Sequence, residues 1–277
     1  MEIALAEQGL FVLPAKVTQD QAKEKAWEQK LNVFGTIAKF LMRPKSEEIQ
    51  VTLLELRFQP FWHAIGHKRF RYDRRTPYQV PVLTDVQTVD IAGQTYTPGQ
   101  GKLILQGMDH CLFEERKEIF LDALTGEPQD LRRYLAFNRV QANDGGTLPQ
   151  DLALAPPEVR ASGVVRQVLG DALRPPSADQ ILEEEVVVDC LDLYYRPVYA
   201  FEYVWQAKDK RVTVEVDGLT GEFKSTGKAF GSQLKRVLQK DVLFDIGAET
   251  INLVVPGGAI ALKLTKAVAE RAGKTGS

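Results

Sequence analysis

Three histidines and one cysteine in the first half of the 277-residue chain are the residues whose chemistry is easiest to name. His63, His67, His110 and Cys111 offer imidazole nitrogens and a thiolate, which are ligands that Zn²⁺ prefers. His63 and His67 are four residues apart, which would place both on one face of a helix. The local pattern is that of a strand, however, in which four residues span about 13 Å. A zinc site is therefore one hypothesis, and hydrogen-bonded histidines on a sheet face are the other.

The segment around His67 is also rich in arginine, and residues 67–75 read HKRFRYDRR. Basic residues interleaved with aromatic ones are typical of surfaces that bind single-stranded nucleic acid. The net charge of the chain is -2, so a general attraction to nucleic acid is absent and none is expected as a partner. The pattern favours a solvated cationic strand, with Arg69 and Arg71 as candidates for contacts with a protein partner.

No catalytic residue and no cofactor is predicted. The chain has no glycine-rich phosphate loop, no nucleophile elbow and no HExxH pattern. Its two cysteines cannot build a disulfide framework. The first residues lack the basic start of a signal peptide, and no apolar run approaches about 18 residues. These observations predict a cytoplasmic protein.

The elements that must position these residues are mainly strands. Residues 186–195 and 198–205 are rich in valine, leucine and aromatics, with Pro197 between them. Residues 211–216 alternate and end in the turn sequence Asp217–Glu222, read DGLTGE, so this region predicts an antiparallel meander.

The same pattern occurs earlier in the chain. Glu47–Trp62 aligns with Glu184–Tyr199 without a gap, which places Pro60 on Pro197. Asp122–Glu127, read DALTGE, repeats the later turn. Because the matched segments occur in the same order, we interpret the chain as an internal duplication.

Each copy is preceded by a helical pattern. The first helix is expected from Thr18, with a capping box to Gln21, to about residue 42, and the second opens at Pro156. The predicted fold class is α+β: two homologous modules, each a helix packed on an antiparallel β-sheet, plus a C-terminal helical tail. The expected boundaries are module one at 1–140 with inserted strands at 83–117, a linker at 141–155, module two at 156–232 and the tail at 233–277.

The tail is expected to form two helices, at residues 233–246 and 259–272. Ile260, Leu264 and Val268 would form one apolar stripe on the second of them. This stripe could fold back or self-associate, dock into a partner, or lie on a membrane surface, and we rank these alternatives in that order because the stripe offers little area for burial in lipid.

The order of elements in each copy resembles the PepSY domain, in which a helix packs on a small antiparallel sheet and the last strand ends in an Asp-containing turn. Val214–Phe223, read VEVDGLTGEF, carries this resemblance best, and Ile119–Glu127 carries it less well. The resemblance implies a non-catalytic binding or inhibitory module.

Two functions from different classes remain. The first is a non-enzymatic binding or scaffold protein that engages a protein or peptide partner, or self-associates through the C-terminal helices. The alternative is a metal-binding protein or metal-dependent enzyme that uses His63, His67, His110 and Cys111.

Overall fold

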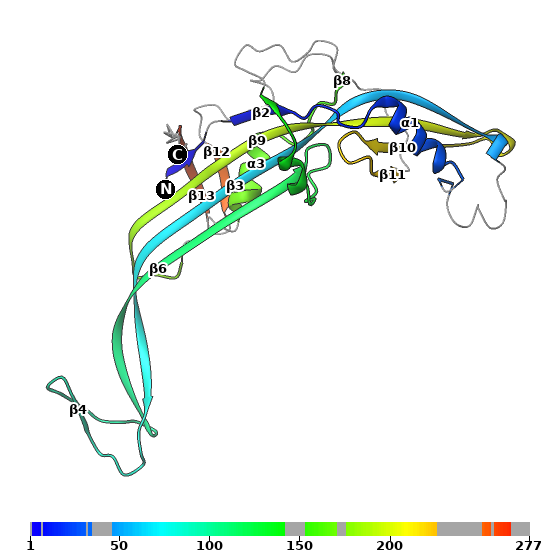
Figure 1. Cartoon of the computed structure of the whole chain (residues 1–277). Coiled ribbons are helices and arrows are strands. Elements are labelled where there is room, and N and C mark those ends of the chain that lie inside the picture. The colour runs from blue at the N-terminus through cyan, green and yellow to red at the C-terminus, as the bar shows by residue number, and fades with distance from the viewer. Residues whose placement is uncertain are drawn as a thin grey trace, which may run out of the picture.

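The computed structural model describes residues 2–6, 8–31, 33–34, 46–141, 153–170, 176–225, 251–255 and 258–266. Its centre is a pair of long antiparallel strands, β3 (Ile49–Pro81) and β9 (Gln180–Trp205). The two strands pair from Ile49 opposite Trp205 to Asp73 opposite Gln180, and they run side by side in Figure 1. All other strands of the large sheet add to this pair.

Each long strand also forms a hairpin with a second strand. Strand β6 (Lys102–Asp122) pairs antiparallel with β3, and β10 (Lys210–Asp217) pairs antiparallel with β9 and then with the short β11 (Phe223–Ser225). The β3–β6 hairpin is much the longer, and its outer end extends away from the rest of the molecule (Figure 1). A small hairpin of β4 (Val89–Ile91) and β5 (Gln94–Tyr96) lies at its tip.

The outer edge of β9 is covered by the start of the chain. Strands β1 and β2 pair with it in parallel, and β13 pairs with β1 in parallel and with β12 antiparallel. Two short strands complete the sheet, β7 against β2 and β8 against β3. The bounds of these strands are Glu2–Leu5 (β1), Gln8–Val12 (β2), Val140–Gln141 (β7), Ala153–Leu154 (β8), Ile251–Val255 (β12) and Gly258–Lys266 (β13).

The predicted fold class of two helix-on-sheet modules is wrong. The protein is mainly β, and β3 and β9 each run without a break through one shared mixed sheet. Pro60 and Pro197 do not end a strand. The carbonyls of both accept hydrogen bonds from the turns that follow β6 and β10. In a strand, the nitrogen and the carbonyl of one residue point to the same side. The nitrogen of each proline therefore faces the end of the hairpin, where no hydrogen bond between paired strands is lost.

The two copies are nevertheless related by the pairing itself. Phe58 lies opposite Pro197, and Pro60 lies opposite Tyr195. The alignment matches Phe58 with Tyr195 and Pro60 with Pro197, so the shift between the two copies converts the first pair into the second. That shift is the separation of Gln59 and Arg196, 137 residues, and these two residues face each other. An approximate two-fold axis therefore passes through the Gln59–Arg196 pair.

Each helix packs mainly on strands of the other copy. The predicted capping box at the start of α1 (Gln19–Glu28) is confirmed, since the Thr18 hydroxyl accepts from the Gln21 amide and the Gln21 side chain accepts from the Thr18 amide. The helix ends at Glu28, well before the predicted residue 42. It covers the C-terminal part of β9 together with β10, where Tyr203, Trp205 and Val214 are buried.

The second helix, α3 (Ala161–Leu169), has the equivalent position over the first hairpin. Its residues Val164, Val165 and Val168 are buried against Trp62 and Leu121 of β3 and β6. Each helix is thus connected in sequence to one half and packed on the other, which a module-by-module interpretation of the sequence does not anticipate. Among the described residues there are also three short 3₁₀ helices, at Ser46–Glu48 (η1), Arg132–Ala136 (η2) and Gln206–Lys208 (η4).

The predicted C-terminal helix at residues 259–272 is also wrong where the structure describes it, because Gly258–Lys266 forms β13. Ile260 and Leu264 fit a helical spacing of four, but with Leu262 they equally fit the alternation of a strand. The second pattern forms here because β1 and β12 offer edges to pair with. The helix expected at 233–246, like Val268, lies outside the described residues.

Among the residues described, no helix is both long enough and apolar enough to cross a lipid bilayer.

Candidate functional site

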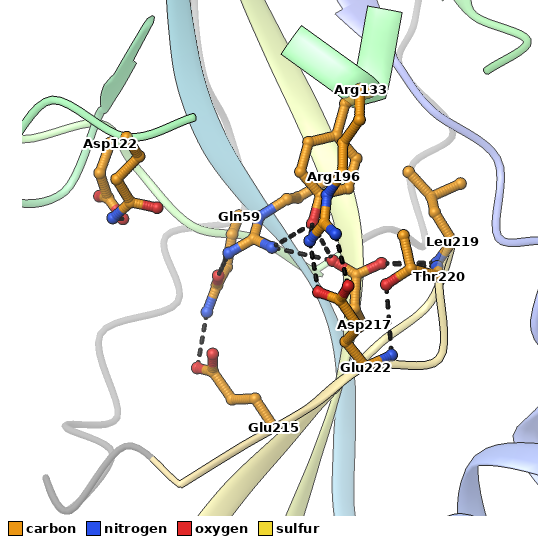
Figure 2. A network of polar contacts seen from close by, with 11 residues as sticks. Gln59, Asp122, Arg133, Arg196, Glu215, Asp217, Leu219, Thr220 and Glu222 are labelled. Atoms are coloured by element: carbon orange, nitrogen blue, oxygen red, sulfur yellow. Dashed lines mark hydrogen bonds and ion pairs between the residues drawn. The ribbon is translucent and has the colours of Figure 1, made fainter. Parts of the chain in front are cut away.

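A buried polar network surrounds the two-fold axis (Figure 2). Arg196 donates to Asp217 at 2.9 Å from one nitrogen and to the side-chain oxygen of Gln59 at 2.9 Å from the other. Gln59 in turn donates to Glu215 at 2.7 Å, and the Tyr134 hydroxyl donates to Asp217 at 2.5 Å. All five residues are more than nine-tenths buried, so their partners lie within the protein, and the network joins the two halves.

The pKa of Asp217 is lowered in this setting. Burial on its own raises the pKa, but the hydrogen bonds from Tyr134 and from the Thr220 and Leu219 amides, together with the charge of Arg196, lower it by more. Asp217 is therefore a paired, ionised group of the core. Its role is to hold the end of β10 on β9 and on η2.

The turns after β6 and β10 have the same hydrogen bonds. In the first turn one carboxylate oxygen of Asp122 accepts from the Leu124 and Thr125 amides at 2.8 and 3.2 Å. In the second turn Asp217 accepts in the same way at 2.9 Å from each amide. The halves differ at the other carboxylate oxygen, which accepts from the Gln129 side chain at Asp122 and from Arg196 at Asp217. Asp217 is thus paired with an arginine, where Asp122 has a neutral glutamine.

The surface that stands out is the outer part of the β3–β6 hairpin, residues 71–112, which we call the arm. Strand β9 reaches only to Asp73, so beyond that residue the arm is a two-stranded ribbon. Seven of the twelve large apolar side chains that are exposed among the described residues lie on it: Tyr78, Val80, Leu83, Ile91, Ile104, Met108 and Leu112. Exposed apolar side chains gathered in one place mark a surface for association.

The two faces of the arm differ. On one face Asp109 accepts hydrogen bonds from Thr76 at 2.5 Å, from Arg74 at 3.1 Å and from Tyr78. The hydrogen bonds from Thr76 and Tyr78 hold the pKa of Asp109 below its ordinary value despite some desolvation. The other face carries Ile104, Met108 and Leu112 of β6, which we call the apolar row.

The outer edge of β6 has no partner strand, because in the part of the chain that is described β6 pairs only with β3. A strand of this length leaves a row of backbone N–H and C=O groups free to pair with another strand. The apolar row lies directly beside this edge. The arm therefore combines the two features that strand addition requires, backbone groups for affinity and side chains for selectivity.

The arginines selected from the sequence lie at the base of the arm and are paired within the chain. Arg69 contacts Glu114 at 3.0 Å, and Arg71 contacts Glu183 at 2.5 Å. All four of these side chains are substantially exposed, so the pairs are of the kind that contributes about 0–1 kcal/mol. The other two partner-binding candidates described, Ile260 and Leu264, lie on β13.

The candidate zinc ligands are distributed over different contacts. His67 contacts Asp189 at 2.8 Å, and His110 contacts Asp73 at 2.7 Å near the start of the arm. Cys111 lies opposite Tyr72 on β3. His63 is buried, and its ring stacks on Phe120. The structure groups it with two residues of β9 that the sequence did not indicate, Cys190 and Asp192.

Comparison with known protein families, with curated proteins and with solved structures finds no match to this chain.

Proposed function

We propose that the protein is a non-enzymatic scaffold protein that assembles with a second copy of itself by pairing the outer edges of β6 along their arms. The observation that carries this proposal is the unpaired edge of β6 beside the exposed apolar row. The opposite face of the arm and the network around Arg196 are already hydrogen-bonded within the chain. The apolar row is the exposed surface that lies beside that edge.

The spacing of the row favours a second copy as the partner. Ile104 and Leu112 lie four residues to either side of Met108. If two β6 strands pair antiparallel with Met108 opposite Met108, Ile104 of each copy faces Leu112 of the other. The same register places Lys102, six residues before Met108, opposite Glu114, six residues after it, and such an opposite-charge pair supports the register.

Cross-linking tests the register directly. In a Cys111→Ser background, Met108→Cys places two thiols opposite each other at the centre of the pair, where the Cβ atoms of facing residues lie about 4.5–5.5 Å apart. Mild oxidation should convert this variant to a covalent dimer of twice 31.0 kDa. The matched control is Ile104→Cys alone, whose thiol faces Leu112 and lies about 27 Å along the strand from its counterpart. Equal cross-linking of both variants, or of neither, would refute the proposed pairing.

Measurement of mass in solution tests the association itself. Met108→Lys should convert a dimer to a monomer of 31.0 kDa, because it places two like charges opposite each other at the centre. Val140→Lys, which alters an exposed apolar residue outside the arm, should leave the dimer intact. Light scattering on both variants and the unaltered chain decides this. An unaltered chain that is monomeric throughout the concentration range would overturn the proposal.

The proposed compartment is the cytoplasm. Both cysteines, Cys111 and Cys190, are half-buried thiols outside any disulfide, and thiols stay reduced where the environment is reducing.

A further inference from the structure

We propose that His63, Cys190 and Asp192 bind one Zn²⁺ ion between the central strands β3 and β9. His63 lies directly opposite Asp192 in the β3–β9 pair, and Cys190 precedes Asp192 by two residues. The three side chains place one ligand atom each within 4.8 Å of one another. This site is independent of the arm, so its test does not depend on the proposed self-association.

The two distances from Cys190 match those expected around a tetrahedral zinc ion. His63 Nδ1 lies 3.6 Å from Cys190 Sγ, and Cys190 Sγ lies 3.3 Å from Asp192 Oδ2. Zinc binds imidazole nitrogen and carboxylate oxygen at about 2.0–2.2 Å and thiolate sulfur at about 2.3 Å, so two tetrahedral ligands lie about 3.5 Å apart. Two of the three ligand pairs therefore have the spacing that the ion requires, and the third, between His63 and Asp192, lies within 4.8 Å.

The second nitrogen of His63 is held in the way that zinc-binding histidines are usually held. Nε2 lies 2.8 Å from Glu118 Oε1, and Arg132 donates to the other Glu118 oxygen at 2.6 Å. A carboxylate paired with an arginine only accepts hydrogen bonds, so Nε2 carries a proton, and in the neutral imidazole that binds a metal Nδ1 then presents its lone pair toward Cys190. Outer carboxylates of this kind fix the ring and its tautomer and strengthen metal binding.

Asp192 is positioned by the chain that passes beside it. Its Oδ1 accepts the Gly9 amide at 3.1 Å, which leaves Oδ2 on the side of Cys190 and within 3.4 Å of the Tyr194 hydroxyl. A Cβ at position 9 would lie 2.3 Å from Asp192 Oδ1, so glycine is needed for this approach. The carboxylate is therefore oriented before any ion binds.

The ligand types select the ion. A thiolate with an imidazole favours zinc and its borderline-soft neighbours over Mg²⁺ and Ca²⁺, which require several oxygen ligands. Three protein ligands leave a fourth position for water or for an atom of a bound molecule.

Titration with Co²⁺ provides the test, because a cobalt–thiolate bond gives a charge-transfer absorption band that reports the sulfur ligand directly. The full-length protein, first treated with a chelator, should bind one Co²⁺ per chain with this band, and Zn²⁺ should displace it. Cys190→Ser should abolish the band, and Asp192→Asn should weaken binding at least tenfold. The matched control, Cys111→Ser, should retain both the band and the affinity.

A variant in the outer contact separates zinc binding from a hydrogen-bonded triad. Glu118→Gln should keep the cobalt band but weaken binding about 10–100-fold, as expected for a carboxylate behind a histidine ligand. Circular dichroism should show that each variant is folded before its titration. The absence of the band in the unaltered protein, or its survival in Cys190→Ser, would refute the site. So would loss of the band in Cys111→Ser.

Discussion

Gln59 and Arg196 occupy equivalent positions in the two segments that align in the sequence, and they are hydrogen-bonded to each other across the central strand pair. Because they differ in chemistry, the axis that relates the halves passes through an asymmetric contact. Arg196 pairs with Asp217 of its own half, whereas Gln59 donates a hydrogen bond to Glu215 of the other half (Figure 2). Arg57 also pairs with Glu215, so the junction holds two largely buried arginine–carboxylate pairs, of which Arg196–Asp217 is the one on the axis.

Substitution of Arg196 should therefore be costly. Arg196→Met leaves the carboxylate of Asp217 buried without its cation, and breaking a buried pair in this way costs about 3–5 kcal/mol. Urea unfolding should show this loss in the free energy of unfolding. The matched control is Arg69→Met, which breaks the exposed pair with Glu114 and should cost about 0–1 kcal/mol. Similar losses in the two variants would contradict the central role of Arg196.

The lowered pKa of Asp217 predicts how stability depends on pH. A carboxyl group whose pKa is lower in the folded state contributes stability that is fully present above its unfolded pKa of about 3.9. That contribution is lost as the pH falls through the lower folded-state pKa. Asp217→Asn should thus be less stable than the unaltered protein at pH 7, and the difference should shrink as the pH falls below about 4. Unfolding curves for both proteins at several pH values measure this, and a constant difference would contradict it.

The glycines of the two equivalent turns should respond to substitution in the same direction. Gly126 and Gly221 have positive φ angles of 77° and 69°, a region that costs an ordinary residue about 1–2 kcal/mol. We expect Gly126→Ala and Gly221→Ala each to lower the free energy of unfolding by at least about 1 kcal/mol. Gly99→Ala is the control, since nothing lies within 4 Å of its Cβ position and its φ is not positive, and it should be nearly neutral.

The capping box of α1 predicts a smaller effect. Thr18→Ala removes the acceptor of the Gln21 amide and should cost about 1 kcal/mol. Thr18→Ser keeps the oxygen and should restore most of this stability. Thermal unfolding of the two variants tests the prediction, and equal losses in both would show that the hydroxyl is not the stabilising group.

Much of the local structure could be predicted from the sequence. The strand patterns, the capping box at Thr18 and the turn residues at Asp122 and Asp217 depend on neighbours in the chain, and such signals can be read from residue types and spacing. The alignment of Pro60 with Pro197 was equally visible. These signals did not show that β3 and β9 pair with each other, because pairing over 137 residues leaves no local pattern.

The candidate metal site shows the same limit. Cys190 and Asp192 alternate on one strand, which is a visible but very common spacing. Only the β3–β9 register brings them to His63, and a shift by one residue would turn both away from it. His67 and His110 were more conspicuous in the sequence, but each contacts an aspartate side chain elsewhere in the structure.

The continuity of β3 and β9 through both halves has a consequence for how the chain folds during synthesis. The central ladder cannot begin to form until β9 starts to emerge at Gln180, and it cannot be completed before Trp205 has left the ribosome, so β3 and its hairpin emerge without their main neighbour. Closing a loop of this length also makes the ladder slow to form relative to local contacts. The newly made first half must therefore wait with an exposed strand edge, and this is the stage at which we expect a chaperone to bind it.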